Sequence, residues 1–385
     1  MAAFSTNILI VGAGPTGLTT ALGLAQRGIE FRIIDALPEA QNTSRAAVIH
    51  AATLESLRGL GIVEHLIGQG MKVRHFRVRD HATLLFETDF SLLPSATPFA
   101  LMIPQDESEQ LLIRQLDILG HKVVRPLRLI RLASASDGIR AACEGPGGYL
   151  AIKARYVVGA DGQKSQVRSE AAIGFPGETY GSFLLADVRM SWPIPKDEVS
   201  LFFSEEGTLV VAPMSKNRYR VVAQLADAPS EPGLQDVQKL IEARGPPGEV
   251  EVKELLWGSR FQVHHRLAER FRAGAILLAG DAAHVHSPAG GQGMNLGIRD
   301  GVALSRALAQ VLGGSSEAVL DSYAQERREA AARILTMTDR LTRVATLTNP
   351  RARWIRNRLI ALAGGLPHVR RSVAKRLAGL ERSVS

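Results

Sequence analysis

Three glycines near the N-terminus have the spacing that holds a phosphate group. Gly12, Gly14 and Gly17 form a G-x-G-x-x-G motif in IVGAGPTG, and an acidic residue, Asp35, follows the next apolar segment. In this motif the first glycine permits a tight turn, the second lets the backbone approach a pyrophosphate, and the third allows close helix–strand packing. The helix that starts there offers N–H groups to the anion, and Asp35 can accept hydrogen bonds from ribose hydroxyls. The motif predicts FAD or NAD binding, because an acid at position 35 would repel the extra phosphate of NADP; a purely structural βαβ unit is the alternative.

A second chemical stretch, AILLAGDAAHVHSPAGGQGMNLG, spans residues 275–297. Asp281 ends an apolar run that reads as a strand, and a carboxylate there points into the crevice where ligands of open α/β sheets bind. The segment 288–293 has almost no side chains, so a flat group can lie against its backbone, and a helix starting near Met294 or Asn295 aims N–H groups at it. A flavin fits this arrangement, because its reduced ring is anionic at the edge that those groups would face. The alternative is a glycine-rich loop in which Asn295 and Asp281 only cap turns.

Composition excludes several classes of site. The chain has 385 residues, 45% of them hydrophobic, which is enough for one large or two fused domains. The single cysteine, Cys143, excludes an intramolecular disulfide framework and a cysteine-built metal site, and it favours a reducing compartment. His284 and His286 flank Asp281, but two histidines without a carboxylate partner are weak evidence for a metal, and we expect none. His264 and His265 are expected at the surface.

The positive charge is concentrated at the C-terminal end. The net charge is +8, and residues 321–385 contain 14 Arg or Lys against 5 Asp or Glu, so this segment alone carries +9 and the rest about −1. Apolar residues at helical spacing predict helices over 321–347, 351–366 and 369–380. Solvated faces of packed helices are the favoured interpretation of the arginines, with membrane-surface contact or nucleic-acid binding as alternatives. No apolar run is long enough to span a membrane and no basic leader opens the chain, so we expect a cytoplasmic protein without nucleic-acid partners.

The elements that must position these residues alternate strands and helices. Residues 8–11 and 31–34 read as strands around a helix over about 14–27. Alternating patterns in KVRHFRVRD, TLLFETDF, FLLADVRMSW, EVSLFFSEEGTLVVAPM and YRVVAQLAD predict a mainly antiparallel sheet. We therefore expect an α/β fold in which residues 1–72, 100–172 and 270–315 form a discontinuous dinucleotide-binding domain. Residues 73–99 and 173–269 form the sheet domain, and residues 316–385 form basic C-terminal helices.

The chain resembles the group A FAD-dependent monooxygenases, the p-hydroxybenzoate hydroxylase-like enzymes. The resemblance rests on GAGPTG, on RYVVGADGQKSQVR at 155–168, and on AGDAAHVHSPAGGQGMNLGIRDG at 279–301, which is especially similar to the phenol and polyketide hydroxylase branch. RLAGLE near the C-terminus is similar to a recurrent ending of that branch. The resemblance implies an FAD-binding Rossmann-like (GR2-type) domain. Many members of the branch carry a further thioredoxin-like domain, for which this chain leaves no room, so its subtype and its state as monomer or homodimer stay open.

The resemblance assigns cofactor contacts residue by residue. It implies that the pyrophosphate lies at the glycine motif, that the adenosine ribose lies at Asp35 with Ala36 beside it, and that Asp281 holds the ribityl or pyrophosphate part. The full set of implied FAD contacts is Gly12, Gly14, Pro15, Thr16, Gly17, Asp35, Ala36, Arg45, Gln105, Asp161, Gly162, Asp281, Pro288, Gly291, Gly293, Met294 and Asn295. Taken alone, Asp161-Gly162 is a turn signal; within this family it is associated with both FAD and the nicotinamide cofactor. Only one G-x-G-x-x-G is present, so NAD(P)H would act as a transient reductant.

The implied reaction is hydroxylation of an electron-rich aromatic ring. In this family NAD(P)H reduces FAD, O2 reacts with the reduced flavin, and the resulting C4a-hydroperoxide transfers a hydroxyl group, so the protein must keep the site dry. We expect Pro288 beside the flavin and, as pocket candidates on the sheet, Phe202, Phe203, Val211, Pro213 and Met214. Arg218 and Arg220 are candidates for flavin movement or for binding an anionic substrate. No general base is assigned.

Two other functions are compatible with the same motifs. A flavin halogenase or an isoprenoid-reducing flavoenzyme would keep the fold, but WPIP at 192–195 is not the W-x-W-x-I-P element of halogenases. A non-catalytic FAD-binding protein is the second alternative. Flavin absorbance and NAD(P)H oxidation with phenolic compounds would distinguish these from a monooxygenase.

Overall fold

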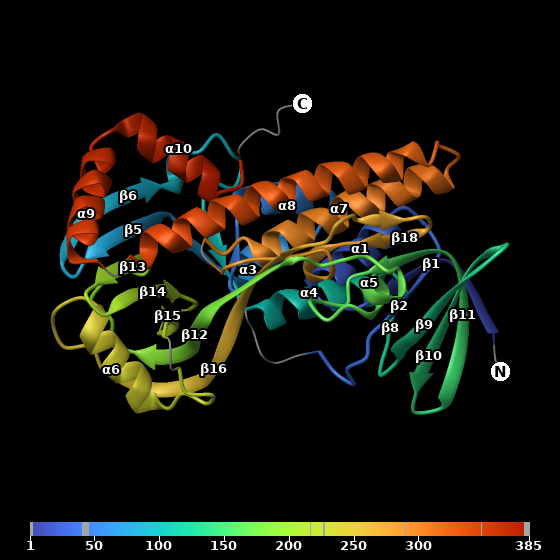
Figure 1. Ribbon diagram of the computed structural model, residues 1–385, viewed down its shortest axis with the longest axis horizontal. Helices are drawn as coiled ribbons and strands as arrows, with labels where there is room; N and C mark the ends of the chain where they lie inside the picture. The colour runs from blue at the N-terminus through green and yellow to red at the C-terminus, as the bar shows by residue number, and fades with distance from the viewer. Residues whose placement is uncertain are drawn as a thin grey trace.

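The computed structural model describes residues 3–40, 46–215, 217–225, 228–288, 290–347 and 349–380. Its strands form two large sheets and one small sheet, with helices packed around them (Figure 1). The fold is therefore of the α/β type that the alternating pattern predicts.

The first large sheet is mainly parallel and contains the predicted N-terminal strands. β1 (Ala3–Val11) lies between β2 (Phe31–Ile34) and β11 (Gly148–Gly159), and all three run in the same direction. Parallel pairing continues outward to β8 (Val123–Val124) and β18 (Ile276–Leu278), whereas antiparallel strands are added by β9 (Arg128–Ala135), β10 (Gly138–Gly145) and β17 (Arg272–Ala273). Because parallel strands end at the same edge, the segments that follow β1, β2, β11 and β18 meet there.

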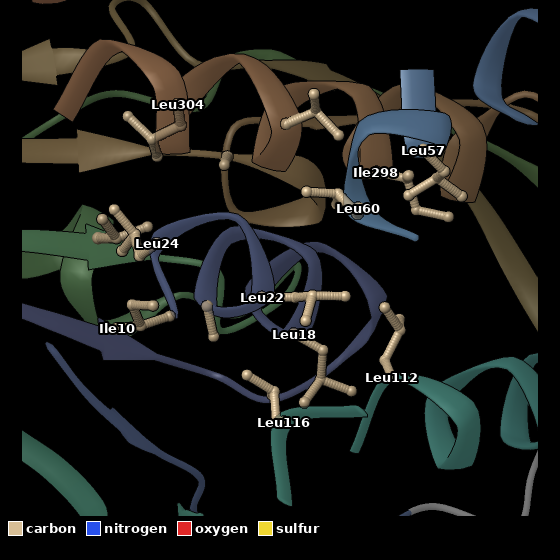
Figure 2. Close-up of a cluster of buried hydrophobic side chains, with 14 of the residues drawn as sticks. Ile10, Leu18, Leu22, Leu24, Leu57, Leu60, Leu112, Leu116, Ile298 and Leu304 are labelled. Carbon is tan, nitrogen blue, oxygen red and sulfur yellow. The ribbon is translucent and has the colours of Figure 1, made fainter. Parts of the chain in front are cut away.

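Helices from three distant parts of the chain cover this sheet. α1 (Pro15–Ala25), α4 (Gln105–Ile118) and α7 (Gly293–Leu312) enclose one continuous apolar core, to which the short α2 (Ala51–Leu57) and η1 (Arg58–Leu60) contribute. Figure 2 shows Leu18 and Leu22 of α1 between Leu112 of α4 and Ile298 of α7. Burial of each leucine stabilises the fold by about 1.5–3 kcal/mol, so this core fixes α7 against α1.

The second large sheet is antiparallel except for one pair. Its order is β19-β16-β12-β15-β14-β13-β5-β6, and only β13 and β5 run parallel. The strands are β5 (His75–Asp80), β6 (Thr83–Asp89), β12 (Gly177–Met190), β13 (Glu198–Ser204), β14 (Gly207–Pro213), β15 (Arg218–Gln224), β16 (Val252–Leu267) and β19 (His284–Val285). One helix, α6 (Leu234–Arg244), packs on one face of this sheet. β19 shows that the stretch following Asp281 leaves the parallel sheet and joins the antiparallel one.

A small sheet and short helices lie in the segments between these larger elements. A small antiparallel sheet contains β3 (Val48–Ile49), β7 (Ala100–Met102) and β4 (Met71–Val73). The short helices are α3 (Val63–Gln69), α5 (Gln166–Glu170), η2 (Phe90–Leu92) and η3 (Gly280–Ala282).

Three helices follow α7, as the apolar spacing predicts. α8 (Ala318–Ala345) runs beside α7, and α9 (Pro350–Gly364) and α10 (Pro367–Leu377) pack at β6 of the antiparallel sheet (Figure 1). Within the described part of the chain, no helix is both long and apolar enough to cross a membrane.

Candidate cofactor and active site

The turn after β1 gives each motif glycine a separate reason to be glycine. Gly12 has a φ of +101°, and a Cβ added to it would lie 2.2 Å from the carbonyl oxygen of Ala160. A Cβ added to Gly17 would lie 1.9 Å from the carbonyl oxygen of Gly12. The protein's own packing therefore requires the first and third glycines, as a tight turn and a close helix–strand contact demand.

Gly14 differs from both, because none of the described residues requires a glycine there. A Cβ added to Gly14 would meet no atom of the described residues within 4 Å, and its φ of −78° is open to any residue. The open direction lies at the N-terminus of α1, where Pro15 occupies the first helical position and helix N–H groups face outward. This is the shape that a pyrophosphate requires, so the residues present fit the diphosphate of a dinucleotide.

Asp35 lies just after β2 and stabilises the glycine turn that follows β1. Its carboxylate accepts hydrogen bonds from the backbone N–H groups of Ala13 at 2.7 Å and Leu37 at 2.9 Å. The half-buried Ala36 follows it directly. The guanidinium of Arg125 donates to the carbonyl of Ala13 at 3.2 Å and lies 4.0 Å from the Asp35 carboxylate. Each carboxylate oxygen can accept a second hydrogen bond, so Asp35 can still take a ribose hydroxyl.

The start of α4 brings a second carboxylate to this turn. Gln105 donates from Nε2 to Glu109 at 2.8 Å and accepts at Oε1 from the N–H of Ala46 at 3.3 Å. Burial raises the pKa of Glu109 to about 7, and the nearby Arg125 opposes this shift while Asp35 adds to it. Gln105 thus lies beside Glu109 at the start of α4, and its contact with FAD stays a prediction. Arg45 lies outside the described residues.

Glycines also bring the second chemical stretch against the first. The Thr16 side chain fits between Gly280 and Gly297, since a Cβ on either glycine would lie 2.4 Å from Thr16 Oγ1. A Cβ on Gly301 would lie 2.7 Å from the Thr16 carbonyl oxygen. Thr16 is therefore in direct contact with glycines that follow it in the sequence by at least 264 positions. The exposed Asp281, next to Gly280, lies beside the α1 N-terminus.

The turn that carries Asp281 is held by a buried ionic cluster. Asp300 of α7 accepts from the Gly280 N–H at 3.1 Å, from Arg327 Nε at 2.7 Å, and pairs with His284 Nε2 at 2.6 Å. Burial alone would raise the pKa of Asp300, but Arg327 and His284 hold it below its ordinary value. His284 therefore has a carboxylate partner, contrary to the expectation that it lacks one, and it positions the backbone. The described residues contain no group of three or more potential metal ligands.

The loop before α7 is fixed by side chains that bind its backbone. Asn295 accepts from the His50 N–H and donates to the carbonyls of Val48 and Gly291, each at 2.8 Å. His50 Nε2 contacts the Gly290 carbonyl at 2.8 Å, and burial lowers the pKa of His50 to about 4. The amide of Asn295 is thus used inside the protein, and main-chain groups of this loop are left to face a ligand. Flanking this loop, Pro288 is exposed, and Gly293 and Met294 are half-buried.

Asp161 organises its own turn. Its carboxylate accepts from Ser165 Oγ at 2.5 Å and from the N–H groups of Gln166 at 2.7 Å and Val167 at 3.1 Å, which begin α5. Gly162 has a φ of +79°. Because Asp161 Cα would lie 2.8 Å from a Cβ on Gly12, this turn supports the glycine motif through backbone packing.

Three of the predicted pocket residues on the antiparallel sheet are covered by other parts of the protein. Phe202 and Val211 are fully buried with α6, and Phe203 lies under the Arg356 guanidinium at 3.8 Å. Pro213 is buried at the end of β14, and Met214 packs with residues of the small sheet on the opposite side from α6. We therefore carry Met214, but not Phe202, Phe203 or Val211, into the proposed pocket.

Register identifies the residues of the opposite face. Val210 pairs with Val222, and Asp187 pairs with Trp257; Val210, Val222 and Trp257 are half-buried and lie outside the α6 core. On the same face Asp187 binds Arg220 through two hydrogen bonds of 2.7 and 2.9 Å. Arg220 is thus a buried structural partner.

Arg218 differs from Arg220 in its exposure. Arg218 donates to Asp187 at 2.8 Å with 28% of its side chain exposed. Burial raises the pKa of Glu107, and the charge of Arg218 opposes this shift. Arg218 therefore faces α4 at the rim of this surface.

Several of these residues carry no recognisable sequence signal. Arg125 sits in an ordinary loop and Arg327 lies on a helix without any motif, whereas Asp300 lies inside the motif at 279–301, which implies no role for it. His265, expected at the surface, is buried, and its Nε2 accepts from the Ser287 N–H at 3.0 Å. His50 could have been suspected only from its position after a short strand.

The comparisons with known proteins agree with this geometry. A family described as FAD binding domain matches residues 5–338. The chain belongs to this FAD-binding family. It is 35% identical over 351 residues to 6-methylpretetramide 4-monooxygenase of Streptomyces rimosus, covering 89% of this chain and 63% of that protein. It is 33% identical over 343 residues to pentachlorophenol 4-monooxygenase of Sphingobium chlorophenolicum, covering 86% of this chain and 63% of that protein. The chain thus spans less than two thirds of the length of these two relatives.

A solved structure of similar size confirms the fold. The crystal structure of p-nitrophenol 4-monooxygenase from Pseudomonas putida DLL-E4 superposes with a TM-score of 0.88, at 23% identity, over 100% of both chains. The predicted fold class and the resemblance to FAD-dependent aromatic monooxygenases are confirmed, and FAD is the cofactor of the family.

Proposed function

We propose that this chain is an FAD-dependent, NAD(P)H-consuming monooxygenase that hydroxylates a phenolic, polyketide-like or other aromatic compound. One observation carries the proposal. Thr16, Gly280 and Gly297 interlock, so that the open cradle at Gly14 and the side-chain-poor loop before α7 belong to a single site.

The residues present would hold each part of FAD in order. The diphosphate would lie at Gly14 and the α1 N-terminus, and the adenosine ribose at Asp35 and Arg125. The ribityl chain would lie near Asp281, and the ring against the backbone of residues 290–294. The N–H groups at the start of α7 would stabilise negative charge on the pyrimidine edge of the ring. Bound FAD would supply transfer of two electrons from NAD(P)H and activation of O2.

The sheet would supply the dry wall opposite that loop. Val210, Val222 and Trp257 present apolar surface that would contact an aromatic ring and exclude water. Met214 would extend this wall toward the small sheet. Arg218 at the rim would orient a phenolate or carboxylate by charge, while Asp187 holds its guanidinium in place.

Oxygen incorporation is the direct test of this function. The FAD-loaded protein is mixed with NADH or NADPH, a panel of phenols and polycyclic phenolics, and ¹⁸O2, and products are analysed by mass spectrometry. We expect at least one product to carry a single ¹⁸O atom. Flavin binding without turnover, NAD(P)H oxidation that yields only hydrogen peroxide, or a halogenated product would contradict the proposal.

A substitution in the wall tests the substrate side separately. Val210→Phe should leave the flavin content unchanged. It should raise KM for the aromatic substrate or uncouple NAD(P)H oxidation from hydroxylation, because the phenylalanine ring would fill space that the substrate ring needs. Leu234→Phe is the matched control, since Leu234 is 37% exposed on α6, across the same sheet. Equal product yields from the two variants would remove Val210 from the pocket.

A further inference from the structure

The outer surface of α9 is apolar where a soluble helix is normally polar. Trp354, Ile355, Leu359 and Leu362 are 62%, 51%, 60% and 70% exposed. At 3.6 residues per turn these side chains share one face of the helix. Leu366, 46% exposed, continues this face just beyond the helix end. We call these five residues the α9 outer face.

Three polar residues of α9, namely Arg353, Arg356 and Asn357, contact the protein on the opposite side of the helix. Asn357 donates to Asp80 at 2.8 Å, Arg353 donates to the Glu205 carbonyl at 2.7 Å, and the Arg356 guanidinium is buried over Phe203. A Cβ on Gly364 would lie 2.8 Å from the Leu85 carbonyl oxygen, so the inner side of α9 is packed directly on β6. The inner side of α9 thus packs through these polar contacts and Ile360, and its burial does not account for the outer leucines.

The segment that carries this face is positively charged and contains no acid of its own. Residues 340–380 contain nine Arg and one Lys and no Asp or Glu. Arg351 and Arg358 are exposed on the same side of α9 as Trp354. Beyond Leu366, a surface hollow is lined by Pro367, His368, Arg371, Ser372 and Lys375. A partner for this surface must therefore be both apolar and anionic.

We propose that α9 and the start of α10 bind the surface of an anionic lipid bilayer. The α9 outer face would enter the boundary between headgroups and acyl chains, and Arg351, Arg358, Arg371 and Lys375 would contact lipid phosphates. A second copy of this chain fits less well, because a two-fold contact would bring the cations of α9 and α10 together, and these helices contain no acid. Nucleic acid would leave the leucines without an apolar partner. This inference is independent of the proposed reaction.

The C-terminal helices also connect this surface to the candidate active site. Gln292, in the loop before α7, donates to the carbonyl of Leu377 at the end of α10 at 3.0 Å. The Ala52 N–H donates to the Ala378 carbonyl at 3.1 Å. The end of α10 is therefore fixed on the loop assigned to the flavin ring, and its start lies at the proposed lipid surface.

Vesicle sedimentation of the full-length, FAD-loaded protein tests the proposal. Vesicles of phosphatidylcholine alone are compared with vesicles containing 30% phosphatidylglycerol (about a third anionic lipid). We expect binding only to the anionic vesicles, weakened by salt, with a blue shift of tryptophan emission. Trp354→Phe should keep the binding but remove most of that shift, because Trp192 and Trp257 are half-buried elsewhere.

Paired variants separate the two contributions. Leu359→Ser with Leu362→Ser should lower the partition coefficient at least about tenfold, and Arg371→Gln with Lys375→Gln should lower it roughly 25-fold, at about fivefold per charge. Tyr149→Ser, 63% exposed on β11, is the control and should bind normally. Circular dichroism and flavin content confirm folding of each variant.

Three results would overturn the proposal. The first is the absence of binding to anionic vesicles at low salt. The second is a dimer, without vesicle binding, that the two serine substitutions convert to monomer. The third is binding to duplex DNA that depends on Arg371 and Lys375 but not on the leucines, together with no preference for anionic vesicles.

Discussion

Replacing Gly14 by alanine separates cofactor binding from folding. Alanine adopts the Gly14 backbone conformation without strain, and within the part of the chain that the structure describes its Cβ would meet no atom within 4 Å. The free energy of unfolding of the apo-protein should therefore change by less than about 0.5 kcal/mol. The same Cβ would stand where the pyrophosphate approaches. FAD affinity should fall at least about tenfold, which corresponds to about 1.4 kcal/mol.

Two other glycines supply contrasting controls. Gly12→Ala forces a side chain onto a φ of +101° and places its Cβ 2.2 Å from the Ala160 carbonyl oxygen. Strain and overlap together should cost about 3 kcal/mol or more, a large part of a typical stability of about 5–15 kcal/mol. Gly59→Ala, where a Cβ also meets nothing within 4 Å but no ligand is proposed, should change neither property.

Urea denaturation of the apo-proteins and titration of FAD, followed by flavin fluorescence, measure both quantities. The expected pattern is loss of affinity alone for Gly14→Ala, loss of stability for Gly12→Ala, and no change for Gly59→Ala. A Gly14→Ala protein that binds FAD as tightly as the parent would refute the assignment of the open direction at Gly14 to a ligand.

Three further substitutions test other parts of the site. Burial raises the pKa of Glu109 to about 7, so ionisation of this carboxyl destabilises the fold as the pH rises from about 4.5 through 7. In urea titrations Glu109→Gln should be more stable than the parent by up to about 3 kcal/mol at pH 8 and equally stable at pH 4. Equal stability of the two proteins at both pH values would contradict this prediction. Asp300→Asn removes the buried charge that binds Arg327 and His284, so the free energy of unfolding at pH 7 should fall by about 3–5 kcal/mol. This difference from the parent should shrink as the pH falls below the ordinary carboxyl range, where Asp300 is protonated. A Tm within 2 °C of that of the parent would contradict the prediction, because a loss of roughly 1 kcal/mol already shifts Tm by about that amount. Asp281→Ala should lower the ratio of flavin to protein absorbance after gel filtration, because Asp281 is exposed beside the proposed cofactor site; an unchanged ratio would remove Asp281 from that site.

The parts of the site that follow local rules could be predicted from the sequence. The glycine turn, Asp35 at the end of β2 and the start of α7 near Met294 follow from short-range spacing and strand–helix alternation. The contacts of Thr16 with Gly280 and Gly297 could not be predicted, because they depend on how two segments far apart in the chain cross.

Strand faces and helix faces show a second limit. Alternation places Val210 and Val211 on opposite faces, but only the position of α6 decides which face is core. Helical periodicity correctly predicts α9, yet the expectation of solvated arginines is wrong for Arg356, because the β6 side of the helix binds the polar residues and leaves Trp354 outside.

A crystal structure of the FAD-loaded protein would show whether the two glycine-rich stretches form one cofactor site. The pyrophosphate should lie beside Gly14 and the α1 N-terminus, the ribityl chain near Asp281, and the ring against the backbone of residues 290–294, facing Val210 and Val222. Electron density for FAD elsewhere, or a ring lying away from the loop before α7, would contradict this placement.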